Sequence, residues 1–205
     1  MDPIIDSVEW NNLMMIYKFA LMEVATKLNI LNEEFEFFHL HNPIEHIKSR
    51  VKSMESLQEK LIRRGYKVTI ENAKHFINDI AGARIICSFT SDIYTIYELI
   101  KKHSDLKVAE VKDYIKYPKP NGYQSLHLLV EVPVFLSDRV EEVRVEIQIR
   151  TIAMDFWASL EHRIFYKFNK DVPEEITNQL KECADMINHL DHKMLSIKNE
   201  IEPYK

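Results

Sequence analysis

The segment VRVEIQIR, residues 143–150, places charged and amide side chains at every second position. Successive side chains of a β-strand point to opposite faces, so one face would be aliphatic and the other would carry Arg144, Glu146, Gln148 and Arg150. A half-exposed strand has the same alternation, so the pattern alone leaves both interpretations open. The segment runs directly into the aromatic-rich stretch TIAMDFWASLEH, as expected of a strand inside the fold.

Asp79 is a second acidic candidate, just before the β-type run RIICSF at 84–89. If this run and the strand at 143–149 are neighbours, Asp79 and Glu146 converge on one cation. Two carboxylates with open positions for water suit Mg²⁺, which takes oxygen ligands and commonly bridges phosphates. Two acids so far apart in sequence are weak evidence when taken alone.

Hydrogen-bond donors recur along one face of a predicted helix: Lys52, Ser56, Lys60, and Arg63 or Arg64, with Arg50 at the upstream end. Side chains three or four positions apart are neighbours on a helix. A row of ammonium, hydroxyl and guanidinium donors is what a polyphosphate chain requires. An amphipathic helix with lysines toward solvent has the same spacing, and both interpretations can hold together.

The loop KYPKPNGYQSLH, residues 116–127, contains two prolines and Asn-Gly, which predict a structured turn. It presents Lys116, Lys119, Tyr123 and His127 together. An aromatic ring beside cations can stack on a base while the cations hold its phosphates. A single tyrosine in a turn is more often a packing residue, so this alternative stays open.

Histidine and cysteine offer little evidence of a transition-metal site. His189 and His192 are one helical turn apart, but no carboxylate or cysteine completes a tetrahedral set around them. Cys87 and Cys183 are far apart, in patterns that predict buried, reduced core residues.

The composition narrows the class of protein. The chain has 205 residues, a net charge of −5 and only three glycines, and it contains no glycine-rich nucleotide loop. No apolar run approaches the roughly 18–20 residues needed to cross a bilayer, and the first residues are acidic where a signal peptide would be basic. We therefore expect a cytoplasmic protein with no membrane association.

The charge is unevenly distributed along the chain. Residues 1–47 carry two basic and eight acidic side chains, whereas residues 48–67 carry seven basic and two acidic ones. Acidic ends around basic inner segments favour a compact anion site over a long nucleic-acid track. RNA binding is therefore possible but not indicated.

The helices and strands that must position these residues are predicted from the spacing of apolar side chains and from the places where Pro and Gly interrupt it. An uninterrupted apolar stripe predicts a long helix over 9–38, and Asn42-Pro43 reads as the N-cap and first residue of a helix over 43–64 that ends at Gly65. Further predicted helices are 71–77, 91–102, 151–166 and 173–200, and predicted strands are 84–89, 107–114, 126–132 and 143–149. Met186 and Met194 form an apolar stripe for core or subunit packing. The mixture predicts one α+β domain.

Four stretches together resemble the RelA/SpoT homologues, and within them the small alarmone synthetases: HNPIEHIKSRVKS (41–53), DIAGARIICSF (79–89), VKDYIKYPKPNGYQSLH (111–127) and VEIQIRTIAMDFWASLEH (145–162). The resemblance implies a nucleotidyltransferase-like mixed β-sheet flanked by helices, with long N- and C-terminal helices. It implies a single synthetase domain over 1–205 with its core at 41–166, and a homotetramer assembled through helices 9–38 and 173–200. Because the resemblance places no hydrolase domain within these 205 residues, we expect synthesis without hydrolysis.

The resemblance also implies a reaction, the transfer of the β,γ-pyrophosphate of ATP to the 3′-hydroxyl of GDP or GTP with release of AMP. Asp79 would bind Mg²⁺, and Glu146 would share the metal or act as the base on the 3′-hydroxyl. ATP would be held by Arg50 and Arg84 at the adenine and by Lys52, Ser56, Lys60 and Arg63 at the phosphates. The acceptor would be held by Tyr123 at the guanine and by Lys112, Lys119 and His127 at the phosphates, with Gln148 and Asp155 orienting it.

Two other functions remain open at the level of sequence. One is a catalytically idle nucleotide or RNA sensor on the same fold. The other is a nucleotidyltransferase that adds a nucleoside monophosphate and releases pyrophosphate instead of AMP.

Overall fold

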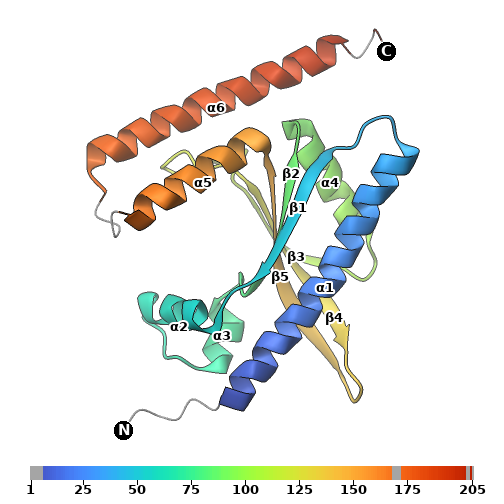
Figure 1. Cartoon of the computed structure of the whole chain (residues 1–205), viewed down its shortest axis with the longest axis vertical. Helices are drawn as coiled ribbons and strands as arrows, with labels where there is room; N and C mark the ends of the chain where they lie inside the picture. The colour runs from blue at the N-terminus through green and yellow to red at the C-terminus, as the bar shows by residue number, and fades with distance from the viewer. Residues whose placement is uncertain (1–6, 168–171, 202–203, 205) are drawn as a thin grey trace.

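A five-stranded mixed sheet forms the centre of the molecule (Figure 1). The computed structural model describes residues 7–167, 172–201 and 204. The strand order is β1-β2-β5-β4-β3, built from β1 (Ile44–Val51), β2 (Ala81–Cys87), β3 (Lys107–Asp113), β4 (Leu126–Phe135) and β5 (Val140–Thr151). β2 runs parallel to β5, and the other neighbouring pairs are antiparallel. The predicted α+β fold is confirmed.

The long helix α1 (Ser7–Phe38) covers the aliphatic face of this sheet and contacts strands β1, β2, β4 and β5. Its stripe is buried as its spacing predicts: Leu13, Ile16, Tyr17, Ala20, Leu21, Val24, Leu28 and Leu31. The β5 residues Val143, Val145, Ile147 and Ile149 are buried as well. Each fully buried large aliphatic side chain contributes about 1.5–3 kcal/mol, so this layer fixes which face of β5 is left for polar groups.

The predicted helix over 43–64 is wrong in its first half, which forms strand β1. Asn42 does not cap a helix; its Oδ1 accepts a hydrogen bond from the Ile44 amide at 2.9 Å, which turns the chain into the strand. Residues 44–51 then pair antiparallel with β2 along their length. Long-range pairing has overridden a local helix signal.

Helix α2 (Met54–Arg63) is the part of that prediction that holds. The Ser53 Oγ accepts a hydrogen bond from the Ser56 amide at 3.2 Å and caps the helix, and Gly65 follows the last turn with φ +77°. The prediction of donors along one helix is therefore correct only for Ser56, Lys60 and Arg63, which lie in α2. Arg50 belongs to β1, and Lys52 belongs to the segment between β1 and α2.

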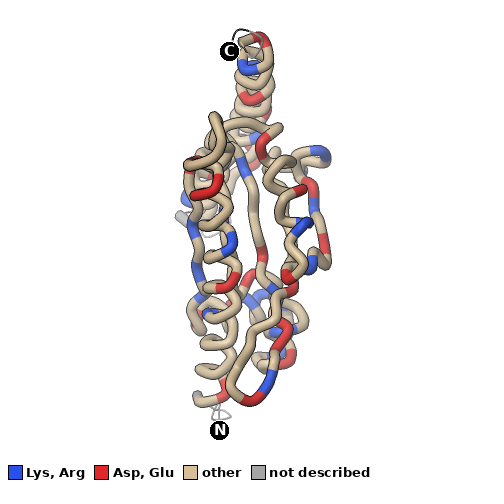
Figure 2. Tube along the Cα trace, turned by 90° about the vertical axis from the view of Figure 1, so that its right-hand side faces the viewer, with Lys and Arg blue, Asp and Glu red and all other residues tan. Residues whose placement is uncertain are grey.

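The remaining helices agree with the sequence within a few residues: α3 (Ile70–Phe76), α4 (Thr90–Lys102), α5 (Ile152–Lys167) and α6 (Glu174–Ile201). In Figure 1, α2 and α3 lie at one end of the sheet, and α5 and α6 lie at the other. Figure 2 shows an elongated molecule with basic and acidic residues interspersed along the visible trace. Within the described ranges, no helix is long and apolar enough to cross a membrane.

Helix α6 is attached to the rest of the fold by polar contacts. The Thr151 hydroxyl donates to Asp191 at 2.6 Å, Lys198 Nζ donates to Asp92 at 2.9 Å, and Trp157 Nε1 donates to the Leu180 carbonyl at 2.8 Å. The prediction that both cysteines are buried is wrong for Cys183, which lies on the exposed side of α6, whereas Cys87 is buried in β2. Met186 and Met194 are also exposed, so they are not core residues of the chain.

Asp191 gives the fold a predictable dependence on pH. Burial raises the pKa of Asp191 above its ordinary value, and the hydrogen bond from Thr151 and the electrostatic effect of His192 only partly oppose this. The folded chain therefore holds this proton more tightly than the unfolded chain, and ionisation of Asp191 costs stability as the pH rises through the folded-state pKa. We expect Asp191→Asn, relative to the wild type, to gain stability between pH 3 and pH 7 in urea unfolding.

The control is Glu182→Gln, which removes an exposed carboxylate from the same helix. The stability of this variant relative to the wild type should change little over the same pH range. A relative stability of Asp191→Asn that stays constant or falls with pH would contradict the effect of burial.

Candidate active site

The polar face of β1, β2 and β5 forms the floor of a pocket of about 390 Å³. The strand register brings Arg50, Gly82 and Glu146 into one row across the three strands, and Lys48, Arg84 and Gln148 into the next. All six residues line the pocket, together with Ser49, Ala83 and Asp79. The two strands that carry the predicted acids are neighbours, so Asp79 and Glu146 face one cavity.

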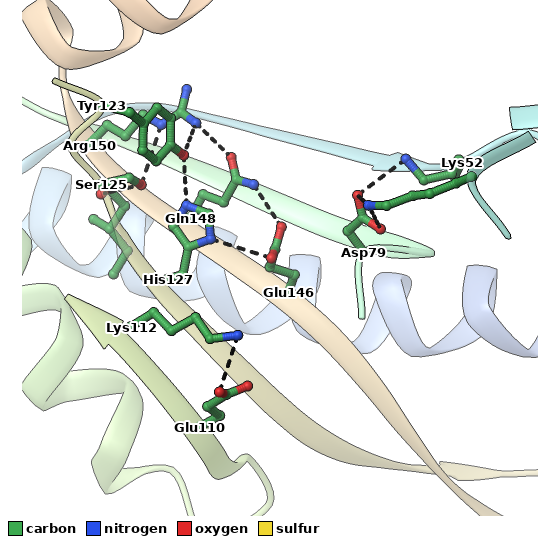
Figure 3. Close-up of polar contacts among 12 residues, drawn as sticks. Lys52, Asp79, Glu110, Lys112, Tyr123, Ser125, His127, Glu146, Gln148 and Arg150 are labelled. Atoms are coloured by element: carbon green, nitrogen blue, oxygen red, sulfur yellow. Dashed lines mark hydrogen bonds and ion pairs between the residues drawn. The ribbon is translucent and has the colours of Figure 1, made fainter. Parts of the chain in front are cut away.

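Asp79 is held by two lysines (Figure 3). Lys60 Nζ lies 2.7 Å from both carboxylate oxygens, and Lys52 Nζ lies 3.3 Å from Oδ2. Burial tends to raise the pKa of Asp79, but the two ammonium groups outweigh burial and hold that pKa below its ordinary value. Burial also lowers the pKa of Lys60, although Asp79 opposes the effect.

Glu146 has a different environment, made of neutral donors and a histidine. Gln148 Nε2 donates to Oε2 at 2.7 Å, and His127 Nδ1 lies 3.4 Å from Oε1. Burial tends to raise the pKa of Glu146, but the contacts with His127 and Gln148 outweigh burial and hold that pKa below its ordinary value. The ionised carboxylate is therefore the stable form at neutral pH.

The loop between β3 and β4 brings an aromatic cluster to the same face. The Tyr123 hydroxyl lies 2.7 Å from His127 Nε2, and Lys119 Nζ lies 4.8 Å from the centre of the Tyr123 ring and 4.6 Å from that of Tyr114. Lys112 lies directly across the β3–β4 ladder from His127, where it pairs with Glu110 at 3.2 Å. The structure thus brings the predicted acceptor residues Tyr123, His127, Gln148 and Lys112 to one side of Glu146.

Two of the predicted donor residues lie farther out. Ser56 and Arg63 are exposed on α2 and do not line the pocket. Arg64, the alternative to Arg63, donates to the Phe76 carbonyl at 2.8 Å and so connects α2 to α3. The structure therefore gives Arg64 a packing role between two helices.

Asp155, at the start of α5, joins the two halves of the site. Its Oδ1 accepts hydrogen bonds from Arg84 NH1 at 3.0 Å and from Arg150 NH1 at 3.1 Å.

Two residues of the site are not predicted from the sequence. The sequence assigns no role to Arg150, since an alternating strand gives Arg144 and Arg150 equivalent positions. It also misses Lys48, because the pattern of that segment predicts a helix. Reading residues 44–51 as a strand would have placed Lys48 and Arg50 on one face.

Carboxylates suited to a hard cation are present in the pocket, but no larger metal-binding cluster accompanies them. Among residues 7–167, 172–201 and 204, no group of three or more His, Cys, Asp or Glu side chains is placed to hold a metal ion. Of the described residues that line the pocket, Asp79 and Glu146 alone supply anionic oxygens, which fits a cation that also takes ligands from water and phosphate.

Comparison with known proteins identifies the class of the chain. The family profile described as "Region found in RelA / SpoT proteins" matches residues 49–171. The chain belongs to the RelA/SpoT family, and within it to the small alarmone synthetases.

Its relatives match over nearly their whole length. GTP pyrophosphokinase YwaC of Bacillus subtilis (strain 168) is 57% identical over 95% of this chain and 92% of the relative. GTP pyrophosphokinase YjbM of the same organism is 35% identical over 96% and 92%. The crystal structure of small alarmone synthetase 1 from Bacillus subtilis bound to its product pppGpp has a TM-score of 0.90 at 34% identity, and covers 96% of this chain and 100% of that chain.

Gly122 offers a test of how the aromatic loop is held. It has φ +87°, and a Cβ there would lie 2.5 Å from the Ala184 Cβ of α6. Gly65 has φ +77°, and a Cβ there would have no atom within 4 Å, so an alanine would experience only the backbone strain. We expect Gly65→Ala to cost about 1–2 kcal/mol for the left-handed backbone, and Gly122→Ala a further 1–3 kcal/mol for the clash.

Urea unfolding of both variants measures the difference. Equal losses of stability would mean that α6 does not press on the loop at Gly122.

Proposed function

We propose that the protein is a GTP/GDP pyrophosphokinase. It transfers the β,γ-pyrophosphate of ATP to the 3′-hydroxyl of GDP or GTP and yields ppGpp or pppGpp and AMP. The observation that carries this proposal is a single pocket with two ionised carboxylates, one held by lysines and the other beside an aromatic and histidine cluster. Support also comes from relatives named GTP pyrophosphokinases and from a similar structure bound to AMPCPP, which has a TM-score of 0.80 and 31% identity.

The lysine side of the pocket is the proposed ATP site. Arg50 and Arg84 stack on the adenine, and the phosphates take the donors Lys52, Ser56, Lys60 and Arg63. In the free protein Lys52 and Lys60 are partners of Asp79, so phosphate oxygens offer these ammonium groups an equivalent anionic partner. The site is therefore already cationic before ATP arrives.

The aromatic side is the proposed acceptor site. Tyr123 stacks on the guanine, Lys112, Lys119 and His127 hold the phosphates, and Gln148 and Asp155 orient the nucleotide. Tyr123 and Lys119 already lie together, so a base and its phosphates meet a ring and cations that the loop has arranged.

Mg²⁺ is the proposed cofactor, and Asp79 and Glu146 are the residues that would hold it. When bound, it neutralises phosphate charge on the donor. Glu146 accepts the proton of the 3′-hydroxyl, or shares the metal. The 3′-oxygen forms a bond to the β-phosphorus of ATP, the bond from that phosphorus to the α,β-bridging oxygen breaks, and AMP leaves with that oxygen. Positioning and charge neutralisation supply most of the acceleration of such transfers.

The test is to incubate the purified protein with Mg²⁺, ATP and either GDP or GTP, and to separate the nucleotides by anion exchange. We expect AMP and a new guanosine tetra- or pentaphosphate in equal amounts, only when an acceptor is present. Glu146→Gln should lower kcat by about 10²- to 10⁴-fold, because a neutral amide cannot take the proton.

Two outcomes would overturn the proposal. Folded wild-type protein that binds nucleotides without forming a new guanosine species would indicate the idle sensor. Release of pyrophosphate instead of AMP would indicate a nucleotidyltransferase.

The stacking role of Tyr123 predicts a selective defect. Base–aromatic stacking contributes about 1–3 kcal/mol, so Tyr123→Ala should raise the acceptor KM about 5- to 100-fold and leave the ATP KM within about twofold. Tyr117→Ala, which removes an exposed ring from the same loop, is the matched control and should change neither KM. An equal rise in both KM values for Tyr123→Ala would exclude the stacking role.

We also propose a single synthetase domain over 1–205, with its core at 41–166, that assembles as a homotetramer through the terminal helices.

Exposed apolar side chains on α6 offer a test of this assembly: Met186, Leu190, Met194, Ile197 and Ile201. Leu190→Glu should lower the mass measured by sedimentation from four chains to fewer, because the charge would be buried at the contact. An unchanged mass would exclude this part of α6 from the interface. A cytoplasmic location is part of the same proposal.

A further inference from the structure

Arg150 is a buried cation at the centre of the site, and the reaction as proposed gives it no task. Its residue is only 4% exposed. NH2 donates to the Tyr123 hydroxyl at 2.6 Å and to Gln148 Oε1 at 3.1 Å, while NH1 donates to Asp155 Oδ1 at 3.1 Å. Nε lies 3.4 Å from Ser125 Oγ. Figure 3 shows the guanidinium beside Tyr123, with Gln148 between Arg150 and Glu146.

Stability alone is a poor explanation for this arrangement. A buried ion pair often contributes no more than well-packed apolar side chains of the same volume, because both charges lose their water. Asp155 supplies the counter-charge but shares the same oxygen with Arg84. A guanidinium has another property that an apolar side chain lacks: it only donates hydrogen bonds.

That property fixes the direction of a first chain of hydrogen bonds. Because Arg150 donates to the Tyr123 oxygen, the Tyr123 hydroxyl proton is free to point at His127 Nε2, 2.7 Å away. Nε2 of the neutral ring is then the acceptor, and the ring proton is on Nδ1. Nδ1 faces Oε1 of Glu146 at 3.4 Å.

A second chain runs from the same guanidinium through Gln148. Since Arg150 only donates, Gln148 turns its Oε1 toward Arg150, and its NH₂ group then faces Glu146. Gln148 Nε2 donates to Oε2 of Glu146 at 2.7 Å. One donor-only group thus begins two chains, and they end at the two oxygens of one carboxylate.

We propose that Arg150 is a positioning residue that sets the direction of both hydrogen-bond chains, through Tyr123–His127 and through Gln148, so that both present N–H groups to Glu146. Without Arg150, the Tyr123 hydroxyl and the Gln148 amide lose the donor that fixes one end of each chain, and only the acceptor Glu146 at the other end still favours the same directions. The benefit for proton transfer rests on the proposed function, but the direction of the bonds does not.

The position of the His127 ring proton tests this inference without any substrate. In ¹⁵N NMR spectra of the metal-free protein at a pH where the ring is neutral, with the signal assigned by its loss in His127→Asn, we expect the Nδ1–H tautomer in the wild type. Arg150→Met should shift the ring toward the Nε2–H tautomer. Tyr123→Phe, which removes the hydroxyl from the first chain and leaves the second, should do the same.

Arg144 supplies the matched control. It lies on the same strand and the same face as Arg150, but its side chain is 46% exposed and pairs with Glu131 outside the pocket. Arg144→Met should leave the tautomer, kcat and both KM values unchanged. Arg150→Met should lower kcat about 10- to 100-fold, as losses of groups that orient a functional residue commonly do, with the ATP KM within about twofold.

The outcomes separate this inference from the proposed function. A wild-type ring in the Nε2–H form, or a tautomer that Arg150→Met does not change, would overturn the role of Arg150 even if alarmone synthesis is observed. The expected tautomers in a protein that makes no alarmone would support the bond directions and refute the proposed function. If Arg150→Met does not fold, Arg150→Gln takes its place: a side-chain amide both donates and accepts hydrogen bonds, so it no longer fixes the direction of the chains and the tautomer should again shift.

Discussion

The parallel pairing of β2 with β5 is the constraint on which the rest of the site depends. It sets Gly82 opposite Glu146 and Arg84 opposite Gln148, and it carries Asp79, two residues before β2, to the same cavity. The aliphatic faces of these strands are sealed against α1. A slip of one residue would turn Glu146 into that core and Ile147 out of it, so the apolar packing that stabilises the fold also fixes the register of the site.

The spacing of apolar residues predicts secondary structure correctly where that spacing fits only a helix or only a strand. The stripe of α1 and the alternation of β5 are of this kind, and both are correct. The segment at 44–51 is different, because Asn42-Pro43 resembles a helix start and the donors beyond it recur at helical intervals. Only its pairing with β2, residues far away in sequence, makes it a strand, and the sequence of the segment does not contain that information.

The acids and the tyrosine of the site could be selected from residue type and motif, whereas Arg150 could not. Arg144 and Arg150 have the same alternation on the same strand. Only the structure distinguishes them, because the end of β5 that carries Arg150 is covered by Tyr123 and Asp155. Burial of a polar face near the end of a strand depends on loops and helices that local patterns do not place.

The two halves of the pocket are built on different physical terms. On the lysine side, Asp79 holds two flexible ammonium groups by charge, and a point charge of this kind can exchange one anionic partner for another without a change in geometry. On the aromatic side, the two chains that lead from Arg150 to Glu146 are directional hydrogen bonds, and they begin at a guanidinium that cannot accept. A polyphosphate needs charge and tolerates variation in position, whereas the removal of a proton from one hydroxyl needs a carboxylate held in one orientation. The contrast between the two halves therefore matches the contrast between binding a donor chain and aligning an acceptor.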